Sequence, residues 1–156
     1  MLSWYAVLKV VHVLSVVVWI GGASALALVT ARLLRARDTA TLAAYLPQAA
    51  KFGQSMGGPA SLLVLLTGIA MVLVGKIGFR PLWVSWGFAG VLLHFAFGAF
   101  VMRKRTMSLA AALSATPADE TRIAEAGRRL RVGTLIYLLI MTSVIVVMVL
   151  KPTLSP

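Results

Sequence analysis

The sequence contains two histidines, and each lies within a long apolar run. His12 belongs to LKVVHVLSVVVWIGG, and His94 belongs to LWVSWGFAGVLLHFAFGAFVM. An ionisable side chain exposed to lipid tails is costly, so such residues generally face a bundle interior or a cavity and indicate a functional site. Imidazole nitrogen is also a common ligand of haem iron and copper. The two histidines are therefore the first candidates for chemistry.

Other kinds of chemistry have few candidate residues. The sequence has no cysteine, which excludes thiolate ligands, disulfides and cysteine nucleophiles. Its carboxylates all lie between the apolar runs, so neither two-carboxylate catalysis nor a nucleophile with a partnered base is expected within them. They are Asp38, Asp119, Glu120 and Glu125. No phosphate-binding loop or zinc-ligand spacing is present.

Each histidine shares a helical face with aromatic or small residues. At about 100° per residue, His12 falls on one face with Ser15 and Trp19. His94 falls on one face with Gly87, Gly90 and Gly98. The glycines are either a helix-packing surface or a smooth wall on which a flat ligand lies beside the imidazole. Glycine by itself favours neither interpretation.

Composition and charge predict a membrane protein. Hydrophobic residues make up 60% of the 156 residues, whereas soluble domains average about 45–50%. The formal net charge is +11, and most of the lysines and arginines lie in residues 32–51 and 103–131. Basic clusters between apolar spans are typical of cytoplasmic loops that meet anionic headgroups. Nucleic-acid binding is the weaker explanation of this charge.

Four apolar segments can each cross a bilayer as a helix of about 20 residues. They lie near residues 5–31, 58–77, 82–102 and 132–150. The first lacks the basic flank and cleavage site of a signal peptide, so we expect it to be retained. The segments between them, near 32–57 and 103–131, are predicted cytoplasmic loops. Within the first of these loops, Pro47 argues against a single continuous helix, and we expect a short interfacial helix leading into the second span. In the second loop we expect a helix with Thr116 as its N-cap that extends into the fourth span.

These spans predict an all-α integral membrane protein, an antiparallel four-helix transmembrane bundle forming one domain over residues 1–156. With both basic loops inside, both termini lie outside. Trp4, Tyr5, Trp83 and Trp86 then form an aromatic belt at the outer interface, independently of the charge count. We expect a multi-pass protein of the cell's inner (plasma) membrane.

The predicted depths of the two histidines agree. At about 1.5 Å per residue, His12 lies about 12 Å below Trp4, and His94 lies about 12 Å below Trp86. The first and third helices of such a bundle are about 11–14 Å apart along the diagonal. One iron with two axial imidazoles could fit between them. The alternatives are a copper site, or two buried histidines hydrogen-bonded to backbone or hydroxyl groups. Tyr137 in the fourth span is either structural or reaches a bound ligand.

The runs LKVVHVLSVVVWIGG, KFGQSMGGPASLLVLLTGIAMVL and RVGTLIYLLIMTSVIVVMVLKP resemble the superfamily of HemJ-type protoporphyrinogen oxidases and CopD copper-resistance membrane domains. The resemblance spans nearly the whole chain and implies four helices. It also implies that His12 corresponds to the family histidine associated with haem b. Where the HemJ type has a histidine and a lysine after a tryptophan in the third helix, this chain has Ser85 and Gly87, and the fourth-helix Asn-Glu-x-Pro element is absent.

The resulting hypothesis is a haem b-binding membrane protein that transfers electrons within a membrane redox system. His12 and His94 are the expected iron ligands, and Trp19, Tyr137 and the three glycines are expected to line the cofactor. Two alternatives stay open, namely an accessory or structural membrane subunit without a cofactor and a divergent HemJ-like oxidase. Expected partners are the lipid bilayer and a redox protein or quinone, and the chain could form a homo-oligomer.

Overall fold

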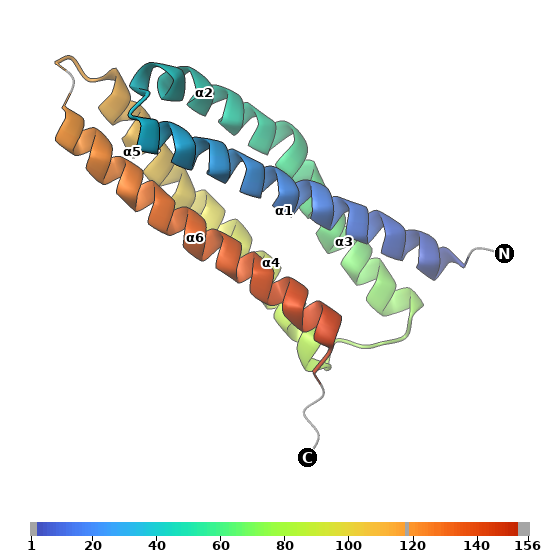
Figure 1. Ribbon diagram of the computed structural model, residues 1–156. Coiled ribbons are helices and arrows are strands. Elements are labelled where there is room, and N and C mark those ends of the chain that lie inside the picture. Colours follow the sequence, from blue (N-terminus) through green and yellow to red (C-terminus); the bar gives the residue numbers. More distant parts are fainter. Residues whose placement is uncertain (1–2, 118, 153–156) are drawn as a thin grey trace.

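The computed structural model describes residues 3–117 and 119–152, and all regular structure in them is helical (Figure 1). The elements are α1 (Trp4–Ala36), α2 (Thr39–Phe52), η1 (Gly53–Gly57), α3 (Gly58–Val74), α4 (Leu82–Phe97), η2 (Gly98–Met102), α5 (Arg103–Ser114) and α6 (Glu120–Leu150). The π-helical turns η1 and η2 join their neighbours without a break, which leaves four long helices. Each of the four is long and apolar enough to cross a membrane. The predicted all-helical architecture with four spanning helices is confirmed.

The segments predicted as loops are largely helical. The second long helix runs from Thr39 to Val74 and passes through Pro47, so the prediction that Pro47 interrupts a helix is wrong. A proline inside a helix removes one backbone hydrogen bond. Helix α2 nevertheless buries Leu42 and Leu46, which are 1% and 6% exposed. We infer that this burial offsets the local cost of the proline.

Side-chain caps fix where the helices begin. The Ser3 hydroxyl accepts a hydrogen bond from the backbone N–H of Ala6 at the start of α1. Asp38 accepts one from Thr41 at the start of α2, and hydrogen bonding to Thr41 holds the pKa of the Asp38 carboxyl below its ordinary value. Asp119 caps α6 by accepting from the backbone of Arg122, although the sequence suggests Thr116 for this role.

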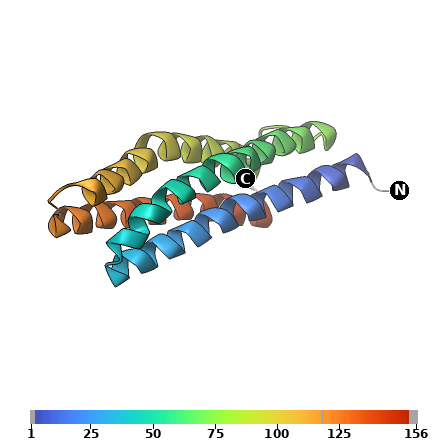
Figure 2. The ribbon, with the colours of Figure 1, turned by 90° about the horizontal axis from the view of Figure 1, so that it is seen from above.

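The helices pack as two antiparallel pairs that meet along α6. Helix α1 packs on α3, α4 packs on α6, and α6 also contacts α1 and α5 (Figures 1 and 2). Both chain ends lie at one end of the bundle, and α2 and α5 meet at the other. The end at α2 and α5 has its own apolar core of Leu42, Leu46, Leu109, Ile123, Ala126 and Leu130. We call it the basic end, because it carries the two arginine-rich segments.

A second apolar cluster lies in the middle of the bundle and connects both pairs. It consists of Trp19 from α1, Ala60 and Val64 from α3, Val91 from α4 and Met141 from α6. Trp19 is 4% exposed and is the largest of these side chains. The candidate site is built next to this cluster.

The charge pattern predicts that the basic end is cytoplasmic, and the absence of cysteine allows a direct test. We expect Ser114→Cys, at the basic end, to react with a membrane-impermeant maleimide only after the cells are opened. Ser3→Cys, at the opposite end, should react with intact cells. Labelling in the reverse pattern would contradict the orientation.

Candidate functional site

The histidine of α1 is hydrogen-bonded to a threonine of α3. His12 Nδ1 lies 2.9 Å from Thr67 Oγ1, and the Val64 carbonyl also lies beside the ring. Gly68 lies beside the His12 ring, where a Cβ would make an ordinary contact of 3.5 Å with His12 Cε1. The pair joins two helices that cross the apolar region side by side. Thr67 is thus a site residue that the sequence alone did not single out.

The hydrogen bonds of Thr67 determine which nitrogen of His12 carries the proton. The Thr67 hydroxyl has one proton and donates it to the Leu63 carbonyl one turn earlier. A short contact from Oγ1 to His12 Nδ1 then requires that Nδ1–H is the donor. The remaining nitrogen, Nε2, makes no hydrogen bond within the described residues and is not completely enclosed by protein atoms. His12 therefore presents an oriented, unoccupied lone pair.

The histidine of α4 lies in an aromatic pocket. His94 is 3% exposed. The Trp19 ring meets it edge-on with centroids 4.4 Å apart, and the Tyr137 ring lies against it at 3.8 Å. His94 Nδ1 is buried and has no hydrogen-bond partner among the described residues. An unpaired buried nitrogen of this kind is costly unless a ligand or water satisfies it.

The structure brings Trp19, His94 and Tyr137 together but leaves His12 apart. Trp19 lies seven residues after His12 on α1, a rise of about 10 Å. His94 contacts Trp19, whereas His12 bonds Thr67, and no contact joins the two histidines among the described residues. We infer that the two rings lie at different levels, and a single iron between them stays a prediction. The estimate of equal depth for the two histidines was measured from Trp4 and Trp86 at the expected membrane interface. The position of α4 along the bundle depends instead on its packing against α6.

Side chains of α6 occupy the space beside two of the three candidate glycines. A Cβ at Gly87 would lie 1.9 Å from Met148 Cε, and one at Gly90 would lie 2.2 Å from Val144 Cγ2. These glycines permit close packing of α4 on α6 and leave no wall for a flat ligand between them. Gly98 differs, because a Cβ there would meet Tyr137 at 3.7 Å, an ordinary contact.

Within residues 3–117 and 119–152, no three histidine or acidic side chains gather as a metal site. Any metal bound at His12 would therefore need ligands from a cofactor or from elsewhere. A macrocycle such as haem supplies most of its own ligands and needs only axial ones from the protein.

The helices, their lengths and their buried polar side chains define an integral membrane protein with four spans. More narrowly, the chain belongs to the DUF2269 family of predicted integral membrane proteins, whose model matches residues 6–152. No curated protein and no solved structure matches the chain.

The tautomer of His12 can be measured by nitrogen NMR of histidine-labelled protein, because only two histidines are present. We expect His12 to be protonated at Nδ1 in neutral protein. Thr67→Val removes the acceptor, so the Nδ1–H preference should fall. The His94→Asn variant assigns the signals, and an Nε2–H signal for His12 in the unmodified protein would contradict the geometry.

Gly90 should tolerate substitution poorly. Gly90→Ala drives a methyl group into Val144, a β-branched side chain with little freedom to move. We expect the free energy of unfolding to fall by about 1–3 kcal/mol, the usual range for an overpacked core. Gly21→Ala is the control, because nothing lies within 4 Å of a Cβ there. Reversible unfolding in mixed detergent measures both, and equal stability of the two variants would refute the packing role.

Proposed function

We propose that the protein binds haem b with His12 as an axial ligand and transfers electrons within a membrane redox system. The observation that carries this proposal is the His12–Thr67 pair. It holds an imidazole within the apolar region with one nitrogen satisfied and the other free.

The His12 environment matches the chemistry of an axial ligand. A ligating histidine almost always donates its other ring N–H to a fixed acceptor, which sets the tautomer and orientation. Thr67 supplies that acceptor from the neighbouring helix. His12 is half-buried among the apolar side chains of α1 and α3, and a hydrophobic shell influences the potential of a bound iron. When bound, the haem supplies one-electron chemistry.

His94 has a different place in the proposal. Its ring is enclosed by Trp19 and Tyr137, away from the level of His12. We therefore assign the iron to His12 and treat the His94 cluster as a separate polar group in the bundle. The orphaned Nδ1 of His94 can hold a proton-donating group, such as a water or a ligand hydroxyl.

The resemblance of the first run to the HemJ and CopD superfamily also supports haem at His12. It supports an oxidase reaction less well, because Ser85 and Gly87 stand where that type has histidine and lysine. Ser85 donates to the backbone carbonyls of Phe79 and Pro81, so its hydroxyl serves the start of α4. We accordingly propose electron transfer, with a quinone or a redox protein as the partner.

The test is haem content. Protein produced with haem available should show a Soret band and a pyridine-haemochrome signal equimolar with the chain. His12→Ala should abolish both. Thr67→Val should weaken haem binding about 10–100-fold, the usual effect of removing a group that orients a metal ligand. His94→Ala should retain the iron spectrum, since His94 lies at another level.

Helical content by circular dichroism controls for misfolding of each variant. Absence of haem from the folded, unmodified protein would refute the proposal and leave an accessory or structural membrane subunit as the function. Equal loss of haem in the two histidine variants would instead restore the bis-histidine arrangement.

A further inference from the structure

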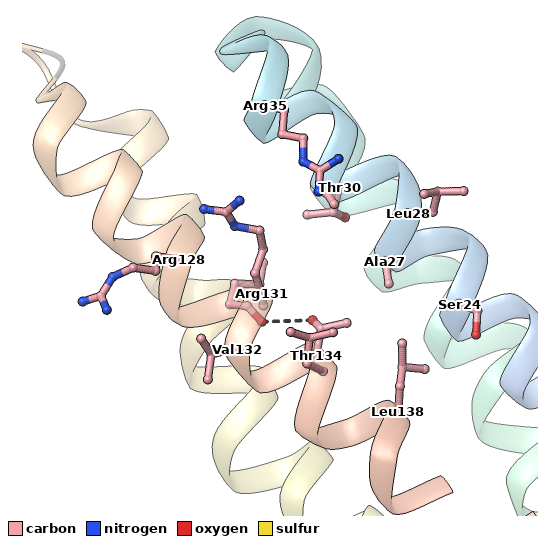
Figure 3. A pocket seen from close by; sticks show the side chains of 13 residues that line it. Ser24, Ala27, Leu28, Thr30, Arg35, Arg128, Arg131, Val132, Thr134 and Leu138 are labelled. Carbon is pink, nitrogen blue, oxygen red and sulfur yellow. Dashed lines mark hydrogen bonds between the residues drawn. The ribbon is translucent and has the colours of Figure 1, made fainter. Parts of the chain in front are cut away.

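A cleft lies between α1 and α6 towards the basic end, away from both histidines (Figure 3). Its volume is about 540 Å³, within the usual range of ligand pockets of about 300–1,000 Å³. Neither His12 nor His94 lines it. The site of the proposed haem is therefore distinct from this cleft.

The cleft changes from basic to apolar along the helices. Arg35 and Arg131 stand at its basic end, one from each helix (Figure 3). Arg35 runs along α1 beside Thr30, Arg131 extends between the two helices, and Arg128 points away. Leu28 on α1 and Leu138 on α6 line the other end. Leu28 lies seven residues from Arg35, and Leu138 lies seven residues from Arg131. Both walls therefore pass from charge to hydrocarbon over about 10 Å.

The arginines of the cleft have no carboxylate partner within residues 3–117 and 119–152. The ion pairs of the described residues join Arg37 to Glu120, Arg122 to Asp119 and Arg129 to Glu125. The remaining acid, Asp38, caps α2. Arg35 and Arg131 thus both line the basic end of the cleft without an ion pair among the described residues, which favours an anion there.

Two of the three hydroxyl groups that line the cleft, those of Thr30 and Thr134, are already satisfied, whereas the Ser24 hydroxyl makes no hydrogen bond among the described residues. Thr30 donates to the Leu26 carbonyl, and Thr134 donates to the Leu130 carbonyl. The inner part of the cleft consequently offers few free hydrogen-bonding groups and suits a hydrocarbon chain. A small soluble anion would use the arginines but leave this apolar part unfilled.

We propose that the cleft binds an anionic phospholipid of the leaflet at the basic end. The phosphate lies between Arg35 and Arg131, and one acyl chain runs along Leu28, Leu135 and Leu138. Arginine pairs with phosphate through two parallel hydrogen bonds, and basic pockets between membrane helices recognise anionic headgroups in this way. Phosphatidylglycerol has both the charge and the chains that the cleft requires.

Native mass spectrometry of the full chain in detergent tests this with phosphatidylglycerol and phosphatidylcholine of identical chains. We expect a preference for phosphatidylglycerol that falls about tenfold or more in Arg35→Gln/Arg131→Gln, since each arginine near a headgroup contributes appreciably. The matched control is Arg103→Gln/Lys104→Gln, which removes the same charge from exposed positions outside the cleft. It should retain the preference.

A second pair of variants tests the apolar part without changing charge. Ala27→Phe fills the cleft wall and should weaken phosphatidylglycerol binding, whereas Ala25→Phe, on an exposed position outside the cleft, should not. Excess inorganic phosphate should fail to displace the lipid. Equal binding of the two lipids, equal losses in the two double variants, or displacement by inorganic phosphate would each overturn the proposal.

Discussion

The structure depends on one constraint, that a polar side chain inside an apolar span must find a hydrogen-bond partner within the protein. The His12–Thr67 hydrogen bond satisfies this constraint between α1 and α3. Trp19 and Tyr137 satisfy it only in part for His94, by enclosing the ring without bonding Nδ1. The two histidines consequently differ in kind. One is oriented with a free nitrogen, and the other is enclosed with an unpaired one.

The architecture was largely predictable because the physics of a bilayer is simple. Length and apolarity identify spans, and the basic segments between them place both at one end of the bundle. Helices leading into the second and fourth spans could be expected from the sequence, but their packing against each other could not. This packing depends on the burial of residues such as Leu42, Leu109 and Ile123 against one another, and single-chain periodicity does not reveal these contacts.

The individual residues of the candidate site were predictable from the sequence, but the contacts between them were not. The face of α1 correctly grouped His12 with Trp19, yet the two residues serve different neighbours. Relative depth could not be derived from the aromatic belt, because the position of α4 depends on how Met148 and Val144 fill the space at Gly87 and Gly90. The hydrogen-bond partner of His12 could be narrowed to very few residues from the sequence. Thr67 is the only hydroxyl in the second span besides Ser61 at its start.

The two π-helical turns set the rotational phase of the helices on either side. A π turn holds one residue more than the α-helical path, which rotates everything beyond it by about 100°. Through η1, the face of α2 that packs against α5 and the face of α3 that carries Thr67 can both point inward on one unbroken helix. The apolar core at the basic end and the His12–Thr67 pair are therefore both built on one continuous helix, from Thr39 to Val74.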